Sequence, residues 1–118
     1  MSSSKIRRGD LYWVDWHPAR GSEQSGHRPA LVIQTDAGNS HPNYPNTIVA
    51  AVSTASVRVP THVQILPTPL NGLSSLSSVK CEQLMTISKE RLQRHIGTLN
   101  EMDMLLVDAA LKRALALE

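Results

Sequence analysis

The chain has few aromatic residues and a single cysteine. Its 118 residues include two tryptophans, two tyrosines and no phenylalanine, and its one cysteine is Cys81. One cysteine excludes a disulfide within the chain, and a thiol in an apolar strand is normally buried and inert. No apolar run approaches the roughly 18 residues of a membrane helix. No apolar segment follows the first five residues either, so we expect a cytoplasmic protein. Residues 1–118 are expected to form one domain, with 1–7 flexible.

Motifs for metals and nucleotide phosphates are also missing. The five histidines are His17, His27, His41, His62 and His95, and no two share the three- or four-residue spacing of metal ligands. No glycine-rich loop opens onto a helix with Lys-Ser or Lys-Thr. We therefore expect no metal site and no cofactor. Twelve Lys plus Arg against ten Asp plus Glu give a net charge of +2, and eight of the twelve are Arg. This balance favours an anionic partner only weakly.

Runs of aromatic and β-branched residues, separated by turn residues, predict a mainly β protein. The expected strands cover residues 9–16, 29–35, 47–54, 61–66, 78–87 and 94–99. Residues 36–39 have turn chemistry, 41–46 are too rich in proline for a regular element, and 88–92 can form one helical turn. Connections of hairpin length favour antiparallel pairing. The predicted fold class is α+β: a small, strongly bent antiparallel barrel of five to six strands.

A C-terminal helix is predicted after Asn100. This residue is a good N-cap, and acidic residues follow it in the first turn. Apolar side chains then recur at helical spacing, which indicates a stripe for core or dimer contacts. Asp108 and Lys112 are four residues apart, so they can pair.

The candidate chemistry lies in residues 17–28, a polar loop between the first two predicted strands. Arg28 precedes Pro29 at the start of a strand, which fixes a guanidinium where it can stabilise charge on a phosphate. Glu23 can exchange a proton, and His27 can do so near neutral pH. The residues alone leave open a second interpretation, a plain surface loop in which Glu23 and Arg28 form an ion pair.

Five segments of the chain carry a family resemblance. They are Arg8-Gly-Asp-Leu-Tyr-Trp-Val-Asp15, Gly21-Ser-Glu-Gln-Ser-Gly-His-Arg-Pro-Ala-Leu-Val-Ile33, Ile48-Val-Ala-Ala-Val-Ser-Thr54, Pro60-Thr-His-Val63 and Cys81-Glu-Gln-Leu-Met-Thr-Ile87. Together with the spacing of Ile96-Gly-Thr-Leu99 before the helix, they cover essentially residues 7–117. These segments resemble the MazF/PemK family of toxins from type II toxin–antitoxin systems.

The resemblance implies an SH3-like barrel with a C-terminal helix, packed as a homodimer. It also implies a sequence-specific endoribonuclease, an mRNA interferase, that cuts single-stranded RNA without a metal. In that reaction the 2′-hydroxyl attacks the adjacent phosphate and leaves a 2′,3′-cyclic phosphate and a 5′-hydroxyl. The resemblance suggests an RNA recognition sequence that contains ACA. A MazE-like antitoxin would inhibit the enzyme by covering its RNA-binding groove with a disordered acidic tail. The positive charges of Arg20, Arg28 and Arg58 would attract such a tail.

The resemblance also assigns roles to single residues. Arg28 matches the catalytic arginine, Ser53 stands where the family usually has a catalytic threonine, and Glu23 matches a glutamate linked to activity. The expected RNA-binding residues are Ser22, Gln24, His27, Thr54, Arg58 and Gln83. The amide of Gln83 can donate and accept, as reading a base edge requires.

Two points of chemistry stay open in the sequence. Ser53 keeps the hydroxyl of the usual threonine, but Thr54 follows it, and alternation along a strand predicts that only one of the two faces the site. A guanidinium holds its proton too tightly to act as a base near neutral pH. We therefore predict that Arg28 stabilises the transition state, while Glu23, His27 or water takes the proton.

Two rival functions fit the same fold. A related toxin fold binds and poisons DNA gyrase without cutting RNA, and a plain RNA-binding barrel would bind without cleavage. Neither needs a catalytic loop, so the intact segment from Glu23 to Arg28 and the hydroxyl of Ser53 argue against both.

Overall fold

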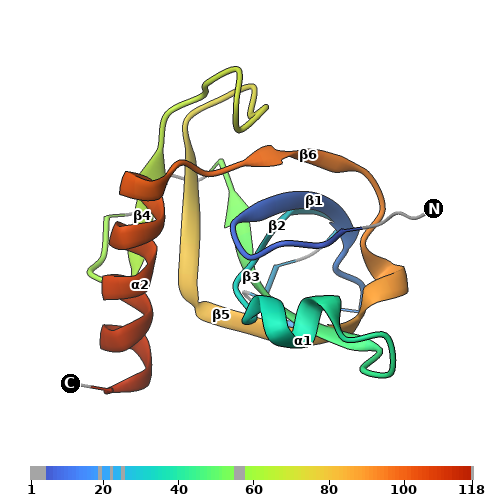
Figure 1. The fold of residues 1–118 in the computed structure, drawn as a ribbon. Coiled ribbons are helices and arrows are strands. Elements are labelled where there is room, and N and C mark those ends of the chain that lie inside the picture. The colour runs from blue at the N-terminus through green and yellow to red at the C-terminus, as the bar shows by residue number, and fades with distance from the viewer. Residues whose placement is uncertain (1–4, 19, 22, 25, 55–57, 118) are drawn as a thin grey trace.

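One strongly curled antiparallel sheet dominates the computed structural model, which describes residues 5–117 except 19, 22, 25 and 55–57 (Figure 1). The strands in this described part are β1 (Asp10–Asp15), β2 (His27–Val32), β3 (Asn46–Ser53), β4 (His62–Ile65), β5 (Ser77–Ser88) and β6 (His95–Thr98). Their order across the sheet is β4-β5-β3-β2-β1-β6. This confirms the predicted α+β class with a strongly bent antiparallel sheet, and it sets the strand number at the upper predicted value, six.

The two faces of the curled sheet each bury an apolar cluster. One face packs against the C-terminal helix α2 (Glu101–Leu115) and includes Leu31 and Val52. The other lies inside the curl and includes Ala30, Ala51 and Trp16. Neighbouring residues of β2 and β3 thus enter different clusters, as the alternation of a strand requires. Within the described part of the chain, no helix is long and apolar enough to cross a membrane.

Helix α2 begins where the sequence predicts. The side chain of Asn100 accepts a hydrogen bond from the backbone N–H of Asp103 at 2.8 Å, which caps the first turn. The predicted pairing of Asp108 with Lys112 is wrong. Asp108 instead forms a salt bridge with Arg8, with 2.7 Å between Nη2 and Oδ1. The Nε of Arg8 also donates to the carbonyl of Ile33 at 2.7 Å, so this arginine ties the helix to the sheet.

Three local boundaries differ from the sequence prediction or refine it. Strand β2 begins two residues early, at His27, because His27 and Arg28 pair with Asp15 and Val14 of β1. The predicted turn at 36–39 is a five-residue helix, α1 (Asp36–Ser40). The predicted helical turn after β5 is the short 3-10 helix η1 (Lys89–Arg91).

The connection between β4 and β5 lies tightly against β6. A Cβ added to Gly97 would sit 2.4 Å from the backbone carbonyl of Asn71, so only glycine allows this approach. The backbone N–H of Thr98 donates to the carbonyl of Leu70 at 3.0 Å. Asn71 is buried, and its side chain bonds the backbone of Leu66 and other residues of the same connection. These contacts fix residues 66–73 as one wall of the site described next.

Candidate active site

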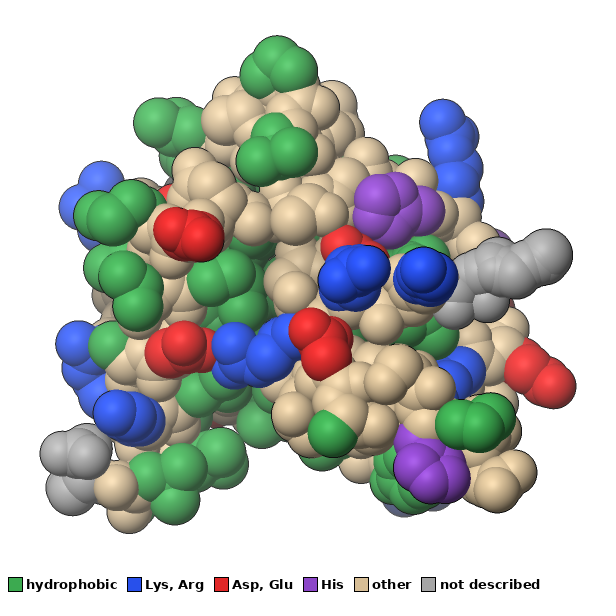
Figure 2. Space-filling view, in the orientation of Figure 1, with side chains coloured by type: hydrophobic (Ala, Val, Ile, Leu, Met, Phe, Trp, Pro, Cys, Tyr) green, Lys and Arg blue, Asp and Glu red, His purple; other side chains and the backbone are tan. Residues whose placement is uncertain are grey.

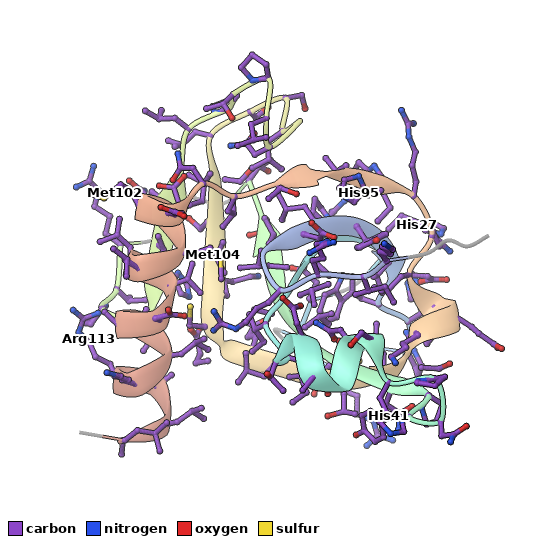
Figure 3. The ribbon with its side chains drawn as sticks, in the orientation of Figure 1. His27, His41, His95, Met102, Met104 and Arg113 are labelled. Atoms are coloured by element: carbon purple, nitrogen blue, oxygen red, sulfur yellow. The ribbon has the colours of Figure 1, made fainter. Side chains whose placement is uncertain are left out.

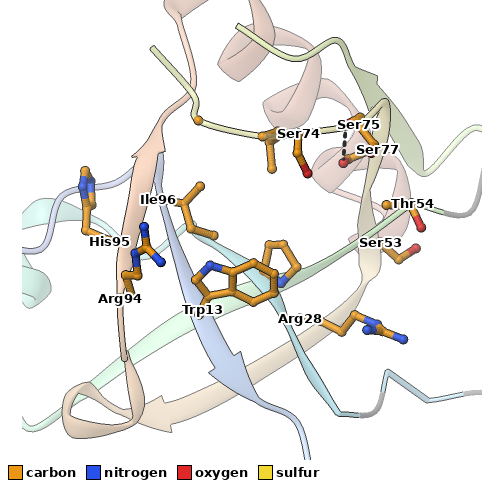
Figure 4. A pocket seen from close by; sticks show the side chains of 13 residues that line it. Trp13, Arg28, Ser53, Thr54, Ser74, Ser75, Ser77, Arg94, His95 and Ile96 are labelled. Atoms are coloured by element: carbon orange, nitrogen blue, oxygen red, sulfur yellow. Dashed lines mark hydrogen bonds between the residues drawn. The ribbon is translucent and has the colours of Figure 1, made fainter. Parts of the chain in front are cut away.

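A pocket of about 430 Å³, called the arginine pocket below, opens at one edge of the curled sheet (Figure 4). Arg28 enters it from β2, and Ser53 and Thr54 enter it from the end of β3. Trp13 of β1 and the segment that begins β6 close the side opposite these residues. The pocket therefore gathers two residues that the sequence predicts for catalysis and one that it predicts for RNA binding.

The guanidinium of Arg28 has no carboxylate partner among the described residues. Its Nη1 makes a long hydrogen bond of 3.4 Å to the carbonyl of His27, and the residue is exposed. The predicted ion pair with Glu23 does not form; instead Oε1 of Glu23 accepts from the backbone N–H of Arg20 at 2.6 Å. The positive charge of Arg28 is thus free for an anionic ligand.

Ser53 has a buried hydroxyl that makes no hydrogen bond in the described structure. A buried hydroxyl without a partner is costly to a folded protein, and in a pocket it is a typical ligand contact. Thr54 is exposed and lines the same pocket, so the prediction that only one of the two hydroxyls faces the site is wrong. The reason is that β3 ends at Ser53, and strand alternation does not continue to Thr54.

A second hollow of about 350 Å³, called the glutamine pocket below, collects other predicted residues. Glu23, Gln24 and Gln83 line it together with Trp16. The Oε1 of Gln83 is buried and makes no hydrogen bond in the described structure, which leaves an acceptor ready for a donor such as a base amine. The predicted residues therefore divide between two neighbouring pockets of the same curled sheet instead of converging on one.

Gln24 connects these two pockets. Its Nε2 donates to the carbonyl of Val52 at 2.7 Å and lies 3.5 Å from the carbonyl of Pro29. Val52 and Pro29 are the immediate neighbours of Ser53 and Arg28. Gln24 is buried, so its amide is a structural clamp between the loop and the strands that carry the two predicted catalytic side chains.

The other predicted residues lie outside both pockets. Arg58 lines a separate hollow with helix α2, away from the lining of the arginine pocket. His27 is exposed at the start of β2, on the same side of the molecule as His95, while His41 lies beside α1 (Figure 3). Ser22 lies outside the described residues.

Lys80 of β5 is a cation that sequence reasoning missed. It is opposite Ala51 in the β3–β5 register, two pairs along from the pair of Ser53 with Ser78. Burial lowers the pKa of its ammonium, and the Arg28 guanidinium lowers that pKa further, against the Glu82 carboxylate, which raises it. Lys80 therefore lies within electrostatic reach of Arg28, although it is not among the residues that line the arginine pocket.

The start of the loop is pinned by Asp15. Its Oδ1 accepts from the backbone N–H of His17 at 3.0 Å and lies 2.8 Å from Nδ1 of the same residue. The backbone hydrogen bond, followed by the side-chain one, lowers the pKa of Asp15. In the described part of the chain, no three His, Cys, Asp or Glu side chains gather as metal ligands.

Sequence reasoning also missed the wall of the arginine pocket formed by Trp13, Arg94 and His95. One signal was available: Trp13 stands between Tyr12 and Val14, which enter the cluster inside the curl, so alternation turns it to the other face. No sequence pattern predicted that Arg94 lies at the arginine pocket. Its position depends on the pairing of β1 with the segment before β6, which joins residues far apart in the chain.

Residues 7–115 match the family model described as the PemK-like, MazF-like toxin of type II toxin–antitoxin systems. The chain belongs to this family. Two curated relatives of this MazF-like toxin have similar length. The Endoribonuclease MazF of Staphylococcus epidermidis is 41% identical over 114 residues, covering 95% of this chain and 92% of the relative. The Endoribonuclease EndoA of Bacillus subtilis is 43% identical over 114 residues, covering 95% of this chain and 96% of the relative.

The fold of this MazF-like toxin also matches solved structures. A mycobacterial endoribonuclease, solved in complex with its cognate antitoxin, aligns with a TM-score of 0.78 at 25% identity, and the match covers 96% of this chain and 97% of that one. The resemblance drawn from the sequence segments is thereby confirmed. Both curated relatives are named as endoribonucleases, which favours the predicted enzyme over the gyrase-binding and RNA-binding alternatives.

Proposed function

We propose that this MazF-like toxin is an endoribonuclease that cuts single-stranded RNA without a metal at a specific sequence. The observation that carries the proposal is the pairing, in one pocket, of an unpaired guanidinium and an orphaned buried hydroxyl, Arg28 and Ser53. Both groups donate hydrogen bonds, and both suit the oxygens of a phosphate whose charge grows in the transition state.

The proposed reaction is a transesterification. The 2′-oxygen of one nucleotide loses its proton and forms a bond to the adjacent phosphorus, and the bond from phosphorus to the 5′-oxygen breaks. The products are a 2′,3′-cyclic phosphate and a 5′-oxygen that takes up a proton. Arg28 and Ser53 donate to the non-bridging oxygens of the phosphorane.

The group that removes the proton is Glu23, His27 or water. Glu23 lines the glutamine pocket and His27 lines neither pocket, so neither is among the residues that line the arginine pocket with Ser53. Water is therefore the favoured acceptor. A pH–rate profile of Glu23→Gln tests this: a rate unchanged at every pH removes Glu23 from the role. Loss of the acid-side limb, along which the rate rises as a general base loses its proton, would assign it.

The test of the proposed function is cleavage of a defined single-stranded RNA in EDTA, with the ends mapped chemically. Cyclic-phosphate and 5′-hydroxyl ends at one recurring sequence are expected. Arg28→Ala should lower the rate on the order of 100-fold or more, because it removes a transition-state contact. Arg7→Ala, which removes an exposed arginine beside α1, is the charge-matched control. Intact RNA with the wild type would contradict the proposal.

We further propose that a cognate antitoxin neutralises the enzyme. The mycobacterial neighbour was solved with its antitoxin. In this chain the exposed, unpaired Arg28 is a contact for an acidic disordered tail of a MazE-like partner. Arg20 lies on the same loop, whereas Arg58 lines the hollow beside α2 and would contact a different part of that partner.

A homodimer completes the proposal. Helix α2 exposes apolar side chains along one side, and Figure 2 shows hydrophobic atoms gathered over this helix. Met102, Leu105 and Leu106 are 69%, 63% and 54% exposed, which is unusual for large apolar residues of one helix. They lie beside β4, an edge strand of the sheet. This face is the proposed contact between two copies.

A further inference from the structure

The arginine pocket extends well beyond the two groups that the proposed reaction requires. Its far side is built from Trp13 of β1 and Arg94, whose backbones are joined because the N–H of Trp13 donates to the carbonyl of Arg94 at 2.9 Å. Figure 4 shows the indole ring between the guanidinium of Arg94 and that of Arg28. Pro29 pairs with Trp13 across β1 and β2, and Ile96 adds a second apolar contact to the pocket.

The charges of this wall have one sign. The 13 lining residues include Arg28, Arg94 and His95 but no aspartate or glutamate. Arg94 is exposed, and no described residue accepts a hydrogen bond from its guanidinium or from the indole N–H of Trp13. His95 is instead held in place, 3.6 Å from a carboxylate oxygen of Asp10 and edge-on to a neighbouring tyrosine ring.

Unpaired cations to either side of an aromatic ring are typical of single-stranded nucleic acid binding. A base stacks on the ring, and the phosphates on either side of the nucleotide meet the cations. We infer that the arginine pocket binds one nucleotide next to the cut, with its base on Trp13, its reacting phosphate at Arg28 and its other phosphate at Arg94. This inference rests on the proposed RNA cleavage and adds the position of a neighbouring nucleotide.

Contacts within the chain hold the wall that the connection between β4 and β5 gives to the arginine pocket. The hydroxyl of Ser77 donates to the carbonyl of Ser75 at 2.9 Å, shown as a dashed line in Figure 4. The contact of Gly97 with Asn71 holds the same connection against β6. Exposed hydroxyls of Ser74 and Ser75 then face a bound base, and each can donate or accept. A preformed pocket loses little freedom on binding, which favours a defined nucleotide position.

The test is a cycle that combines a protein change with a substrate change. Cleavage is followed under single-turnover conditions on an RNA that contains the recognised sequence, and on versions shortened by one nucleotide on the 5′ or on the 3′ side of the cut. Trp13→Ala should lower kcat/KM by roughly tenfold on the long RNA, a typical loss for one stacked base. That loss should shrink when the RNA is shortened on one side only. Arg94→Ala should follow the same pattern, whereas Gln93→Ala, an exposed neighbour outside the pocket, is the matched control.

Fluorescence gives a readout that does not need cleavage. An RNA with a 2′-deoxy nucleotide at the cut cannot react, and its stacking should quench the emission of Trp13. Trp13→Phe keeps the buried Trp16 as the remaining indole and should lose the quenching while it still binds the RNA. A glutamate-rich peptide serves as a second probe, because an acidic protein segment is the other ligand with suitable charge.

The outcomes separate the inference from the function on which it rests. A wild type that leaves all RNA intact fails the proposed function itself. A wild type that cleaves while Trp13→Ala and Arg94→Ala lose the same factor on every RNA length overturns the nucleotide position. Quenching by the peptide but not by the RNA assigns the wall to an acidic protein segment and also overturns it.

Discussion

At the scale of the residue, the types of the site side chains could be predicted from the sequence, whereas their partners could not. Arg28 was marked by its place before a proline at the start of a strand. That Glu23 turns to the backbone of Arg20 instead depends on the path of the loop, which no spacing encodes. Lys80 escaped notice because a lone lysine in a strand is normally a solvated side chain, and only the fold puts it near Arg28.

Ser53→Ala should separate activity from stability. The hydroxyl has no partner in the described structure, so its removal breaks no internal hydrogen bond and relieves an unsatisfied group. The melting temperature should hold or rise slightly, while the cleavage rate falls on the order of 100-fold through loss of a transition-state donor. Thermal melts and single-turnover cleavage of the same preparations check this, and Ser53→Thr, which keeps the hydroxyl, should retain most activity. A lower melting temperature with full activity would assign Ser53 to the fold alone.

At the scale of the element, strand positions were predicted well because alternation and turn residues are local signals. Helix α1 was missed since five residues that include Gly38 and Asn39 are too few to show a helical period. The sequence predicted that the sheet is strongly bent but not where along the strands the bend lies. Its details come from an irregularity in β5, opposite the step from Ala50 to Ala51, which no local pattern reveals.

The contact between β5 and the start of β4 should stabilise the fold to a degree that depends on pH. Burial raises the pKa of Glu82, but hydrogen bonds from His62 at 2.7 Å and Thr61 at 2.8 Å outweigh it, and the net pKa lies below the ordinary 4.5. A carboxyl with a lowered folded-state pKa stabilises the fold above its unfolded value, and that contribution is lost as pH falls through the folded value.

Glu82→Gln should therefore be less stable than the wild type at pH 7 by at most about 1 kcal/mol, because water screens a partly exposed pair. The difference should close as the pH drops below 4.5. Denaturant unfolding at pH 7 and at pH 3 measures it, with Thr86→Ala, an exposed residue of the same strand, as the control. A stability difference that stays constant with pH would refute the charge-linked role.

Gly97→Ala should damage the wall of the arginine pocket. The new Cβ would lie 2.4 Å from the carbonyl of Asn71, and the connection must move away from β6 to admit it. Overpacking of this kind costs about 1–3 kcal/mol. Denaturant unfolding measures that loss, and cleavage of the long RNA should fall more than cleavage of a shortened one. A variant as stable as the wild type would contradict this prediction, because the connection would then move away from β6 at no cost in free energy.

At the scale of the whole molecule, the pattern of the sequence predicted a curled sheet with one helix but not the division of the site. Two neighbouring pockets form because the loop after β1 folds over the end of the sheet, and Gln24 fastens it to Val52. Contacts between residues far apart in the chain, such as Arg8 with Asp108, set this arrangement. Their energy depends on the finished fold, so local reasoning could not supply them.

The proposed dimer gives a prediction at the same scale. Leu106→Arg places a charge at the centre of the exposed apolar face of α2, where a partner helix would have to bury it. Light scattering after size exclusion should show the wild type as a dimer and the variant as a monomer with an unchanged circular dichroism spectrum. Lys112→Glu, an exposed change on the same helix that reverses a charge, is the control. A variant that remains dimeric would place the interface elsewhere.

The hydrogen bond from Thr98 to Leu70 has a consequence for solubility. An open sheet leaves two edges whose free N–H and C=O groups can pair with another chain and start aggregation. At β6, the outward N–H of Thr98 is already occupied at 3.0 Å by the carbonyl of Leu70, and Gly97 admits no strand between them. The connection that walls the arginine pocket therefore also caps this edge and keeps that side of the sheet closed to edge-to-edge pairing.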